Sequence, residues 1–301
     1  MNENTKICVI YGGLSAEREV SLKSGKNVAD ALLKNFKSVE LIDADFNLAS
    51  KLTEIKPDIC VIALHGTYGE DGCVQGMLEM MGIPYTGAGV AASAVAFDKL
   101  LAKHTFTDFG LITPRFKIVN LGDSEPPFLP CVVKPTRQGS SIGVTIVKEK
   151  DEYSKAVEEA FKYDNKVICE EFISGMELTI PVMEGKAFPP IWIRPKKGFY
   201  DYENKYTAGA TEYLLDTGLS SDRLDKLSSE AIKAYNALGC RSMARIDFIA
   251  TDNEFYIIEV NTVPGMTATS LVPKSASKLG ISFEEIVKQI AETASLDNKK
   301  Q

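Results

Sequence analysis

The sequence predicts a mixed fold that is α/β in its first part and α+β in the rest. Over residues 6–85, apolar strand-like runs alternate with helical patterns, which is typical of a parallel, doubly wound sheet. Beyond residue 130, strand-like runs follow one another across short turns, which indicates antiparallel hairpins. The chain has 301 residues, enough for about two or three domains.

Two glycine-rich stretches stand where a doubly wound sheet binds ligands. The predicted elements of the first region are strand 6–11, helix 17–36, strand 38–45, helix 48–55 and strand 58–64. GGLSAE (12–17) directly follows the first strand, and HGTYGEDG (65–72) directly follows the third. Parallel sheets bind ligands beyond the carboxyl ends of their strands. The first region therefore predicts a ligand site that includes both stretches.

The second region combines hairpins, helices and one long polar segment. Its predicted elements are helix 90–110, a hairpin at 130–148 with a Gly/Ser loop, helix 151–163, strand 166–173, strands between 176 and 195, helix 221–238, a hairpin at 243–261 and helix 283–295. The polar segment, KKGFYDYENKYTAGA (196–210), has four tyrosines in or beside it. We expect an ordered lid over residues 197–211, because a loop of this length inside a compact protein is usually functional.

The composition argues against several classes of function. The net charge is −7 and the pI is near 5.1, which disfavours general electrostatic binding to nucleic acid or to an anionic membrane. No apolar run approaches the roughly 20 residues of a membrane span, and the N-terminus resembles a first strand rather than a signal peptide. The six cysteines form no C-x-x-C pair, and four lie in strand-like runs. Small buried cysteines in a reducing cytoplasm fit best, with metal binding or a catalytic thiol as the alternatives.

The hairpin at 243–261 carries charged residues in an otherwise apolar strand pair. A three-residue loop at 252–254 sets Asp247 opposite Glu259. Because side chains alternate along strands, one face is apolar and is expected to form a core; it consists of Ala244, Ile246, Phe248, Ala250, Tyr256, Ile258 and Val260. The opposite face consists of Arg245, Asp247, Ile249, Phe255, Ile257, Glu259 and Asn261. Spacing alone therefore gathers four polar residues at one end of the hairpin: Arg245, Asp247, Glu259 and Asn261.

Two explanations fit this polar cluster. Arg245 can neutralise the two carboxylates in a structural ion-pair cluster. Alternatively, Mg²⁺ binds through the carboxylates together with the phosphates of a nucleotide. The side-chain carbonyl of Asn261 suits a hard cation. Its amide group adds only a hydrogen-bond donor, which Arg245 does not need, so the sequence favours the metal.

The first hairpin offers a place for the phosphates of such a nucleotide. Lys134 ends an apolar strand, and the Gly/Ser loop at 139–143 follows, with N–H groups and hydroxyls that can line a phosphate. A solvated lysine beside an ordinary turn is the simpler alternative. Glu170 and Glu171 adjoin the apolar pair at 172–173, which suits the edge of an adenine and its sugar.

In these motifs the chain resembles the D-alanine–D-alanine ligases of the ATP-grasp superfamily. The resemblance runs from about residue 6 to the last helix and includes eight stretches in the family's order. They are GGLSAEREVSLKSG (12–25), ALHGTYGEDGCVQGMLEMMGIPYTGAG (63–89), DKLLAK (98–103), VVKPTRQGSSIGV (132–144), EEFISGMELT (170–179), GFYDYENKY (198–206), ARIDF (244–248) and EVNTVPGMTATSLVP (259–273). It implies an ATP-grasp fold in three parts: an N-terminal substrate-binding domain at 1–88, a central subdomain at 89–174 and a C-terminal subdomain at 175–301.

The resemblance implies that two D-alanines are joined at the expense of ATP, for peptidoglycan precursors. In this family a D-alanine carboxylate attacks the γ-phosphate, and the amine of a second D-alanine displaces phosphate from the resulting D-alanyl phosphate. The expected metal is Mg²⁺, as two ions for which Mn²⁺ can substitute, and the expected assembly is a cytoplasmic homodimer. The alternatives are a ligase whose second substrate is D-lactate or D-serine, and a non-catalytic ATP-binding relative.

The resemblance also implies a role for each matching residue. The expected catalytic residues are Glu17, which fixes the first ammonium and is linked through Ser140 to Tyr206 of the lid, and Arg245 and the N–H of Gly265, which stabilise the oxyanion. The other expected substrate residues are His65 at the first D-alanine, and Ser270 and Leu271 at the second carboxylate. The expected ATP contacts are Lys99, Lys134 and Lys205 for the phosphates, Glu170, Phe172 and Ile173 for adenine, and Glu177 for ribose. The expected metal ligands are Asp247, Glu259 and Asn261.

Structural roles stay open for four of these residues, and three positions depart from the family pattern. The structural alternatives are a macrodipole role for Glu17, a satisfied hydrogen bond for His65, a solvated helix position for Lys99 and a packing role for Tyr206. The departures are Gln138 for the common Glu, Phe97 for Met and Ala244 for Gly. Relatives that form D-alanyl-D-lactate lack the lid tyrosine, so Tyr206 favours an amine nucleophile.

Overall fold

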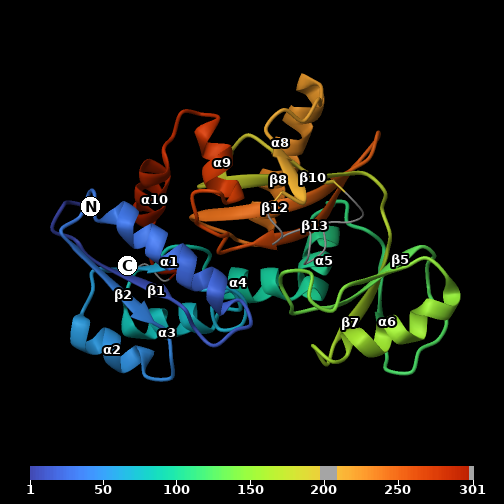
Figure 1. Ribbon diagram of the computed structural model, residues 1–301, viewed down its shortest axis with the longest axis horizontal. Helices are drawn as coiled ribbons and strands as arrows, with labels where there is room; N and C mark the ends of the chain where they lie inside the picture. Colours follow the sequence, from blue (N-terminus) through green and yellow to red (C-terminus); the bar gives the residue numbers. More distant parts are fainter. Residues whose placement is uncertain (197–208, 298–301) are drawn as a thin grey trace.

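The computed structural model describes residues 1–196 and 209–297, and within these residues the chain forms three separate sheets. Figure 1 shows the sheet of the N-terminal region on the left, the largest sheet in the centre and a smaller sheet on the right. The predicted combination of a parallel sheet with antiparallel ones is therefore confirmed.

The N-terminal sheet is parallel and has helices on both faces, as predicted. Its elements are β1 (Lys6–Tyr11), α1 (Arg18–Leu32), β2 (Ser38–Asp43), α2 (Leu48–Ile55), β3 (Ile59–Ile62) and α3 (Cys73–Met81), with strand order β2-β1-β3. Apolar side chains of α1 pack against one face of the sheet, and those of α2 and α3 against the other. Both glycine-rich stretches leave strands of this sheet at their carboxyl ends, which places them at one edge.

The smaller sheet contains the first predicted hairpin. Its elements are β4 (Phe116–Val119), β5 (Cys131–Pro135), β6 (Thr145–Val147), a short 3₁₀ helix (Lys150–Glu152), α6 (Tyr153–Ala160) and β7 (Val167–Glu171), with strand order β4-β7-β5-β6. All its pairs are antiparallel, and α6 covers one face. The other face carries Lys134 and Glu170 toward the centre of the molecule.

The largest sheet lies in the centre of the molecule, between the N-terminal sheet and the smaller sheet (Figure 1). Its strands are β8 (Met176–Met183), β9 (Lys186–Ala187), β10 (Ile191–Pro195), β11 (Thr211–Leu214), β12 (Met243–Ala250) and β13 (Phe255–Asn261), in the order β11-β10-β8-β12-β13, with β9 paired to β8. The remaining helices are α4 (Val90–Phe97), α5 (Lys99–Asp108), α8 (Ser221–Ala237), α9 (Leu271–Ser277) and α10 (Phe283–Glu292). Figure 1 shows α10 beside α1, and Val287 and Ala291 of α10 join the core of the N-terminal sheet.

The β12–β13 hairpin confirms one prediction and corrects two others. Asp247 lies opposite Glu259, as predicted, but the expected three-residue loop at 252–254 is wrong, because Ala250 pairs with Phe255 and not with Tyr256. Between this pair and the next, Phe248 opposite Ile257, the register shifts by one residue and leaves Ile258 as the extra residue of a bulge. The expected core positions Tyr256 and Ile258 are therefore wrong, because the bulge reverses the alternation and turns Phe255 and Ile257 into the core instead.

The predicted helix 90–110 is two helices, α4 and α5, with a break at Asp98. Asp98 has extended backbone angles, and its Oδ1 accepts hydrogen bonds from the N–H groups of Leu100 (3.0 Å) and Leu101 (3.3 Å). A side chain that caps a new helix in this way explains why one helical pattern yields two helices.

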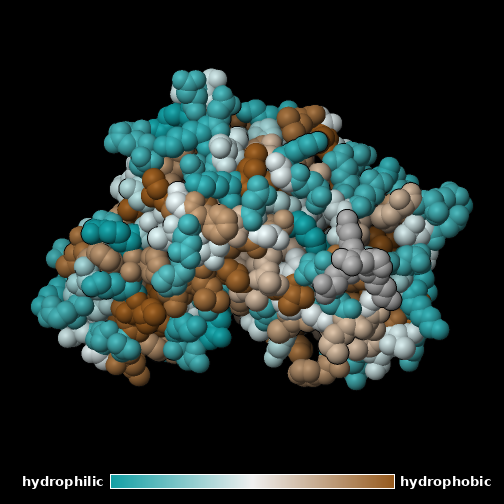
Figure 2. Space-filling view, turned by 180° about the vertical axis from the view of Figure 1, so that it is seen from behind, coloured by the Kyte–Doolittle hydropathy of each residue, from teal (hydrophilic) through white to brown (hydrophobic). Residues whose placement is uncertain are grey.

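The burial of most cysteines and the mixed surface agree with what the composition predicts. Cys8, Cys60, Cys131 and Cys169 are buried and unpaired, whereas Cys73 is exposed. No helix in the described residues is long and apolar enough to cross a membrane. Figure 2 shows the rear face, where hydrophobic patches are separated by hydrophilic side chains and the lower edge is indented between two lobes.

Candidate functional site

Two adjoining cavities lie where the three sheets meet. The larger has a volume of about 440 Å³, and residues of the N-terminal sheet, the Gly/Ser loop and the segment after β13 line it. The smaller, of about 150 Å³, lies between the smaller sheet and the β12–β13 hairpin. Ser140, Arg245 and Leu271 line both cavities, so a molecule in one is next to a molecule in the other.

Glu17 and Ser140 meet in the larger cavity from opposite sides. Glu17 directly precedes α1, and Ser140 belongs to the Gly/Ser loop and donates a hydrogen bond from its Oγ to Glu17 Oε1. Two glycines give the carboxylate its space: a Cβ at Gly139 would lie 2.7 Å from Glu17 Oε2, and one at Gly66 would lie 2.9 Å from it. A side chain at either position would displace this carboxylate, and the positive φ of Gly66 (+69°) itself favours glycine.

His65 lies against α1 at the edge of the same cavity. It is buried, and its Nε2 is 3.3 Å from Ser24 Oγ on α1, while its carbonyl accepts a hydrogen bond from Ser15 Oγ (2.6 Å). The loop after β3 is thereby fastened to the loop after β1. A satisfied structural histidine and a substrate contact are both compatible with this position.

The opposite wall of the larger cavity consists of Arg245 and the segment after β13. Gly265, Ser270 and Leu271 line it, and Ser270 directly precedes α9. The N–H of Thr267 donates to Ser270 Oγ (2.9 Å), which fixes this hydroxyl. The guanidinium of Arg245 and the hydroxyl of Ser270 therefore line the same cavity as Glu17.

Every expected ATP contact within the described residues lines the smaller cavity. They are Lys99, Lys134, Glu170, Phe172, Ile173 and Glu177. Lys134 Nζ is 2.8 Å from Glu170 Oε1, and the Nζ of Lys99 donates to the carbonyl of Gln138 (2.8 Å) and lies 3.3 Å from Glu259 Oε2. The wall thus provides two ammonium groups and an apolar edge, the arrangement that suits a nucleotide.

The three expected metal ligands lie together at the end of the hairpin. Asp247 accepts two hydrogen bonds from Arg245, of 3.0 and 2.9 Å, one from Thr179 Oγ1 (2.5 Å) and one from the side-chain amide of Asn261 (3.0 Å). The ion pair with Arg245 that the sequence left as an alternative is therefore present. No group of three His, Cys, Asp or Glu side chains in the described part of the chain forms a metal cluster. Two carboxylates and an amide still make an all-oxygen set that fits a hard cation.

Sequence reasoning missed Glu70, which lines both the larger cavity and a small recess beside Lys99 and Glu259. Its Oε2 accepts a hydrogen bond from the N–H of Gly66 (2.8 Å). Burial raises the pKa of Glu70 to about 8, and the charge of Glu17 adds to the effect. The signal was available, because Glu70 belongs to the HGTYGEDG stretch that follows β3.

Two expected site residues, Lys205 and Tyr206, lie outside the described residues. So does most of the predicted lid at 197–211. The described residues next to that segment, Gly209 and Thr211, line the larger cavity.

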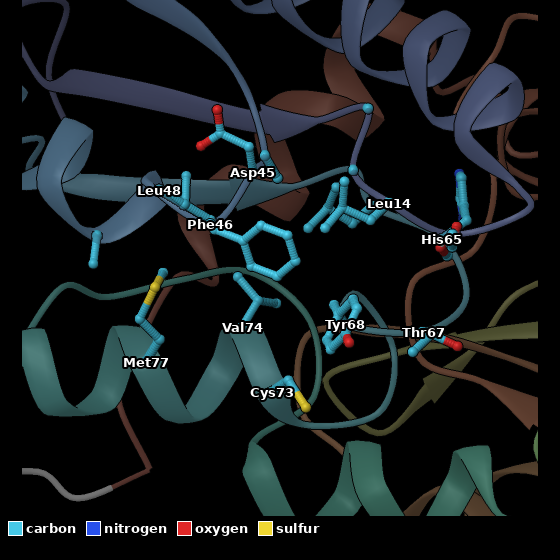
Figure 3. A pocket seen from close by; sticks show the side chains of 16 residues that line it. Leu14, Asp45, Phe46, Leu48, His65, Thr67, Tyr68, Cys73, Val74 and Met77 are labelled. Atoms are coloured by element: carbon cyan, nitrogen blue, oxygen red, sulfur yellow. Dashed lines mark hydrogen bonds between the residues drawn. The ribbon is translucent and has the colours of Figure 1, made fainter.

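A third, mostly apolar pocket of about 240 Å³, called the outer pocket below, lies at the carboxyl ends of β1, β2 and β3, beside α2 and α3. Figure 3 shows Phe46 and Val74 pointing toward one another in it, while the ring of His65 points away toward α1. Phe46 is 88% exposed, and Leu14 and Tyr68 beside it are about half exposed. None of the expected site residues except His65 belongs to this pocket.

Comparison with protein families gives two matches, in chain order. The family model described as "D-ala D-ala ligase N-terminus" matches residues 42–88, and the one described as "D-ala D-ala ligase C-terminus" matches residues 123–292. Together they span more than half of the chain.

Individual proteins match over nearly the whole length. The D-alanine–D-alanine ligase of Syntrophotalea carbinolica is 47% identical over 98% of this chain and 97% of its own. That of Anaeromyxobacter sp. (strain Fw109-5) is 46% identical over 97% of each chain. Among solved structures, the D-alanine–D-alanine ligase from Bacillus anthracis complexed with ATP has a TM-score of 0.83 and 34% identity, over 96% of this chain and 97% of that one.

Proposed function

The chain belongs to the D-alanine–D-alanine ligase family and is an ATP-dependent ligase that joins two D-alanines, and from this premise we propose which residues carry each step. One observation carries the proposal. The described residues expected to hold D-alanine line the larger cavity, those expected to hold ATP line the smaller one, and the two cavities meet at Ser140, Arg245 and Leu271.

The first D-alanine binds in the larger cavity with its ammonium at Glu17. A carboxylate held by close backbone and a Ser140 hydroxyl is suited to fix a cationic group in one position. His65 closes the cavity beside it. This orientation directs the substrate carboxylate toward the shared boundary, where the γ-phosphate of ATP lies.

ATP binds in the smaller cavity. Lys99 and Lys134 neutralise the phosphates, Glu170 accepts a hydrogen bond from the amino group of adenine, the backbone at 172–173 lies along the base, and Glu177 holds the ribose. Lys205, also a phosphate contact in this proposal, lies outside the described residues. In the first step, an oxygen of the D-alanine carboxylate forms a bond to the γ-phosphorus, the bond to the bridging oxygen breaks, and ADP leaves.

Asp247, Glu259 and Asn261 would hold Mg²⁺, as two ions, at the boundary of the cavities. When bound, the metal supplies positive charge that screens the phosphates from the attacking carboxylate. The Nζ of Lys99 lies 3.3 Å from Glu259 Oε2. When ATP binds, this ammonium leaves Glu259 and pairs with a phosphate oxygen instead.

The second D-alanine binds beside Ser270 and Leu271, which hold its carboxylate. Its ammonium loses a proton to solvent, and the amine then forms the C–N bond to the carbonyl carbon of the D-alanyl phosphate. The resulting tetrahedral intermediate collapses as the C–O bond to phosphate breaks, phosphate leaves and the nitrogen gives up a second proton. Arg245 and the N–H of Gly265 stabilise the oxyanion, a contribution worth about 3–4 kcal/mol for one well-placed donor. In this proposal Tyr206 is linked to Glu17 through Ser140. The presence of this tyrosine favours an amine over a hydroxyl nucleophile.

We also propose that the chain has three domains, that it forms a homodimer and that it is located in the cytoplasm. The proposed domain bounds are 1–88, 89–174 and 175–301. The free cysteines and the use of ATP support the location. Three exposed hydrophobic side chains around the outer pocket, Leu14, Phe46 and Tyr68, support self-association, because such patches mark protein interfaces.

Phosphate release with ATP, Mg²⁺ and D-alanine as the only amino acid tests the function. We expect one phosphate and one ADP for each D-alanyl-D-alanine formed. Parallel reactions with D-serine or D-lactate added to limiting D-alanine identify the second substrate by the mass of the product. Turnover that requires one of these additions would contradict the proposed substrate.

A further inference from the structure

Lys103 is a fully buried lysine beside the smaller cavity, which is called the nucleotide cavity from here on. No step of the proposed reaction uses this lysine. It lies on α5 one turn after Lys99, its side chain is 1% exposed, and it does not line the cavity. Because a buried ammonium is costly unless it is paired and hydrogen-bonded, its partners indicate its role.

The partners of Lys103 belong to the wall of the nucleotide cavity or lie directly behind it. Its Nζ lies 3.0 Å from Glu170 Oε1, donates to Thr113 Oγ1 (2.6 Å) and is 3.4 Å from the carbonyl of Pro114. The ring of Phe116 lies 5.3 Å from it. The ammonium thus makes two hydrogen bonds to oxygen atoms of the protein and an ion pair with Glu170.

Glu170 is shared between two lysines. The same oxygen, Oε1, lies 3.0 Å from Lys103 Nζ and 2.8 Å from Lys134 Nζ, and all three side chains are buried. Burial raises the pKa of Glu170, but the two lysine charges outweigh burial and hold the pKa below its usual range. Burial also lowers the pKa of Lys103 to about 8, so that this lysine still carries its charge at neutral pH.

The two lysines differ in what else they can reach. Lys134 lines the cavity, whereas Lys103 is held behind the wall by Thr113 and Pro114. A nucleotide phosphate can therefore compete with Glu170 for Lys134 but not for Lys103. If Lys134 were the only partner, its departure would leave an unpaired buried carboxylate, which is strongly unfavourable.

We propose that Lys103 is a positioning residue that serves as the permanent counterion of Glu170, so that Lys134 can leave Glu170 for the nucleotide phosphates. The inference rests on the proposed function, in which Glu170 binds the amino group of adenine. An ionised Glu170 accepts a hydrogen bond from this amino group and repels the carbonyl oxygen that hypoxanthine has in the same position. Lys103 thus keeps Glu170 ionised for the base while Lys134 binds the phosphates.

Lys103→Met, which keeps the length of the side chain and removes the charge, tests the proposal. Without Lys103, Lys134 stays on Glu170, so we expect affinity for ADP in calorimetric titrations to fall by about 10- to 100-fold, the effect of losing a hydrogen bond to a charged group. Affinity for adenosine, which has no phosphate, should fall much less, and the ratio of kcat/KM for ATP to that for ITP should not change, because Lys134 keeps Glu170 ionised. Lys166→Met, at a half-exposed lysine that pairs with Asp98 outside the cavity, is the matched control.

A purely structural role predicts a different result. Lys103→Met would then lower Tm but leave the ADP affinity as in the unaltered enzyme, and this outcome overturns the proposal. The double variant Lys103→Met with Glu170→Gln leaves no buried carboxylate without a counterion and guards against misfolding of the single variant. Its ADP affinity should equal that of Glu170→Gln within about twofold, the limit of additivity between independent changes. If the double variant binds ADP at least tenfold more weakly than Glu170→Gln, Lys103 acts on the phosphates directly and the proposal is wrong.

Glu170→Gln separates this inference from the function on which it rests. If Glu170→Gln leaves the ATP/ITP ratio unchanged, Glu170 does not bind the base and that part of the proposed function fails. If Glu170→Gln lowers the ratio and Lys103→Met leaves the affinity for ADP unchanged, only the role of Lys103 is wrong.

Discussion

Asp247 lies opposite Glu259 across β12 and β13, and the pair has a different cation on each side. Arg245 makes two hydrogen bonds to Asp247, and Lys99 lies 3.3 Å from Glu259. Two carboxylates at adjacent positions repel each other unless cations neutralise them. The arrangement therefore serves either a stable ion-pair cluster or a metal site in which Lys99 gives way, and these two roles predict different results on substitution.

Glu259→Gln should raise the Mg²⁺ concentration needed for half-maximal activity by at least about tenfold, because a neutral amide is a much weaker ligand for a hard cation. Activity measured against Mg²⁺, and separately against Mn²⁺, checks this. Glu254→Gln, at the turn of the same hairpin and paired with Lys226 on the surface, is the control. A lower Tm with an unchanged Mg²⁺ requirement would identify the cluster as structural.

Glu17→Gln should raise KM for D-alanine by about 10- to 100-fold while leaving KM for ATP within about twofold, because it removes a charge-assisted hydrogen bond to the substrate ammonium. Glu19→Gln distinguishes this from a macrodipole effect, since Glu19 is exposed in the first turn of α1. Equal losses of Tm in the two variants, with unchanged KM for D-alanine, would favour the macrodipole.

Glu70 should make the stability of the substrate-free protein depend on pH. Its pKa is raised to about 8, so the native state holds the proton more tightly than the unfolded state, in which the ordinary value is 4.5. Its contribution to stability is complete below pH 4.5 and is lost as the pH rises through about 8.

Glu70→Gln imitates the protonated form and tests this directly. Its Tm should match that of the unaltered protein near pH 4.5 and exceed it by several degrees above pH 8, since about 1 kcal/mol corresponds to roughly 2–4 °C in chains of 150–250 residues. Glu54→Gln, at an exposed position of α2, should show no such divergence. A constant difference in Tm across this pH range would contradict the raised pKa.

Phe46→Glu should convert a homodimer into a monomer, because it places a charge among the exposed hydrophobic side chains of the outer pocket. Light scattering coupled to size-exclusion chromatography gives the molar mass of each form. Phe109→Glu removes a similarly exposed hydrophobic residue from the end of α5 and should leave the mass unchanged. A dimer that survives Phe46→Glu would place the interface elsewhere.

The sequence by itself determined the classes of sheet and the existence of both hairpins, because these depend on hydrophobic periodicity, a local property of the chain. The sequence predicted the pair of Asp247 and Glu259 through a loop of the wrong length, and the pair forms because the bulge offsets that difference. The sequence did not determine the bulge at Ile258, because an extra residue in one strand is set by packing against neighbouring strands and helices.

Residue spacing could not show which distant side chains share a cavity; the tertiary structure decided this, and it contains the contact between Glu17 and Ser140 that the family resemblance implied. Glu17 and Ser140 are 123 residues apart and meet because two sheets converge. Glu70 belonged to a stretch that the sequence marked, but its raised pKa depends on burial and on Glu17. Lys103 looks like an ordinary helix lysine until the fold places Glu170 3.0 Å away, since charge, burial and partner are properties of the assembled protein.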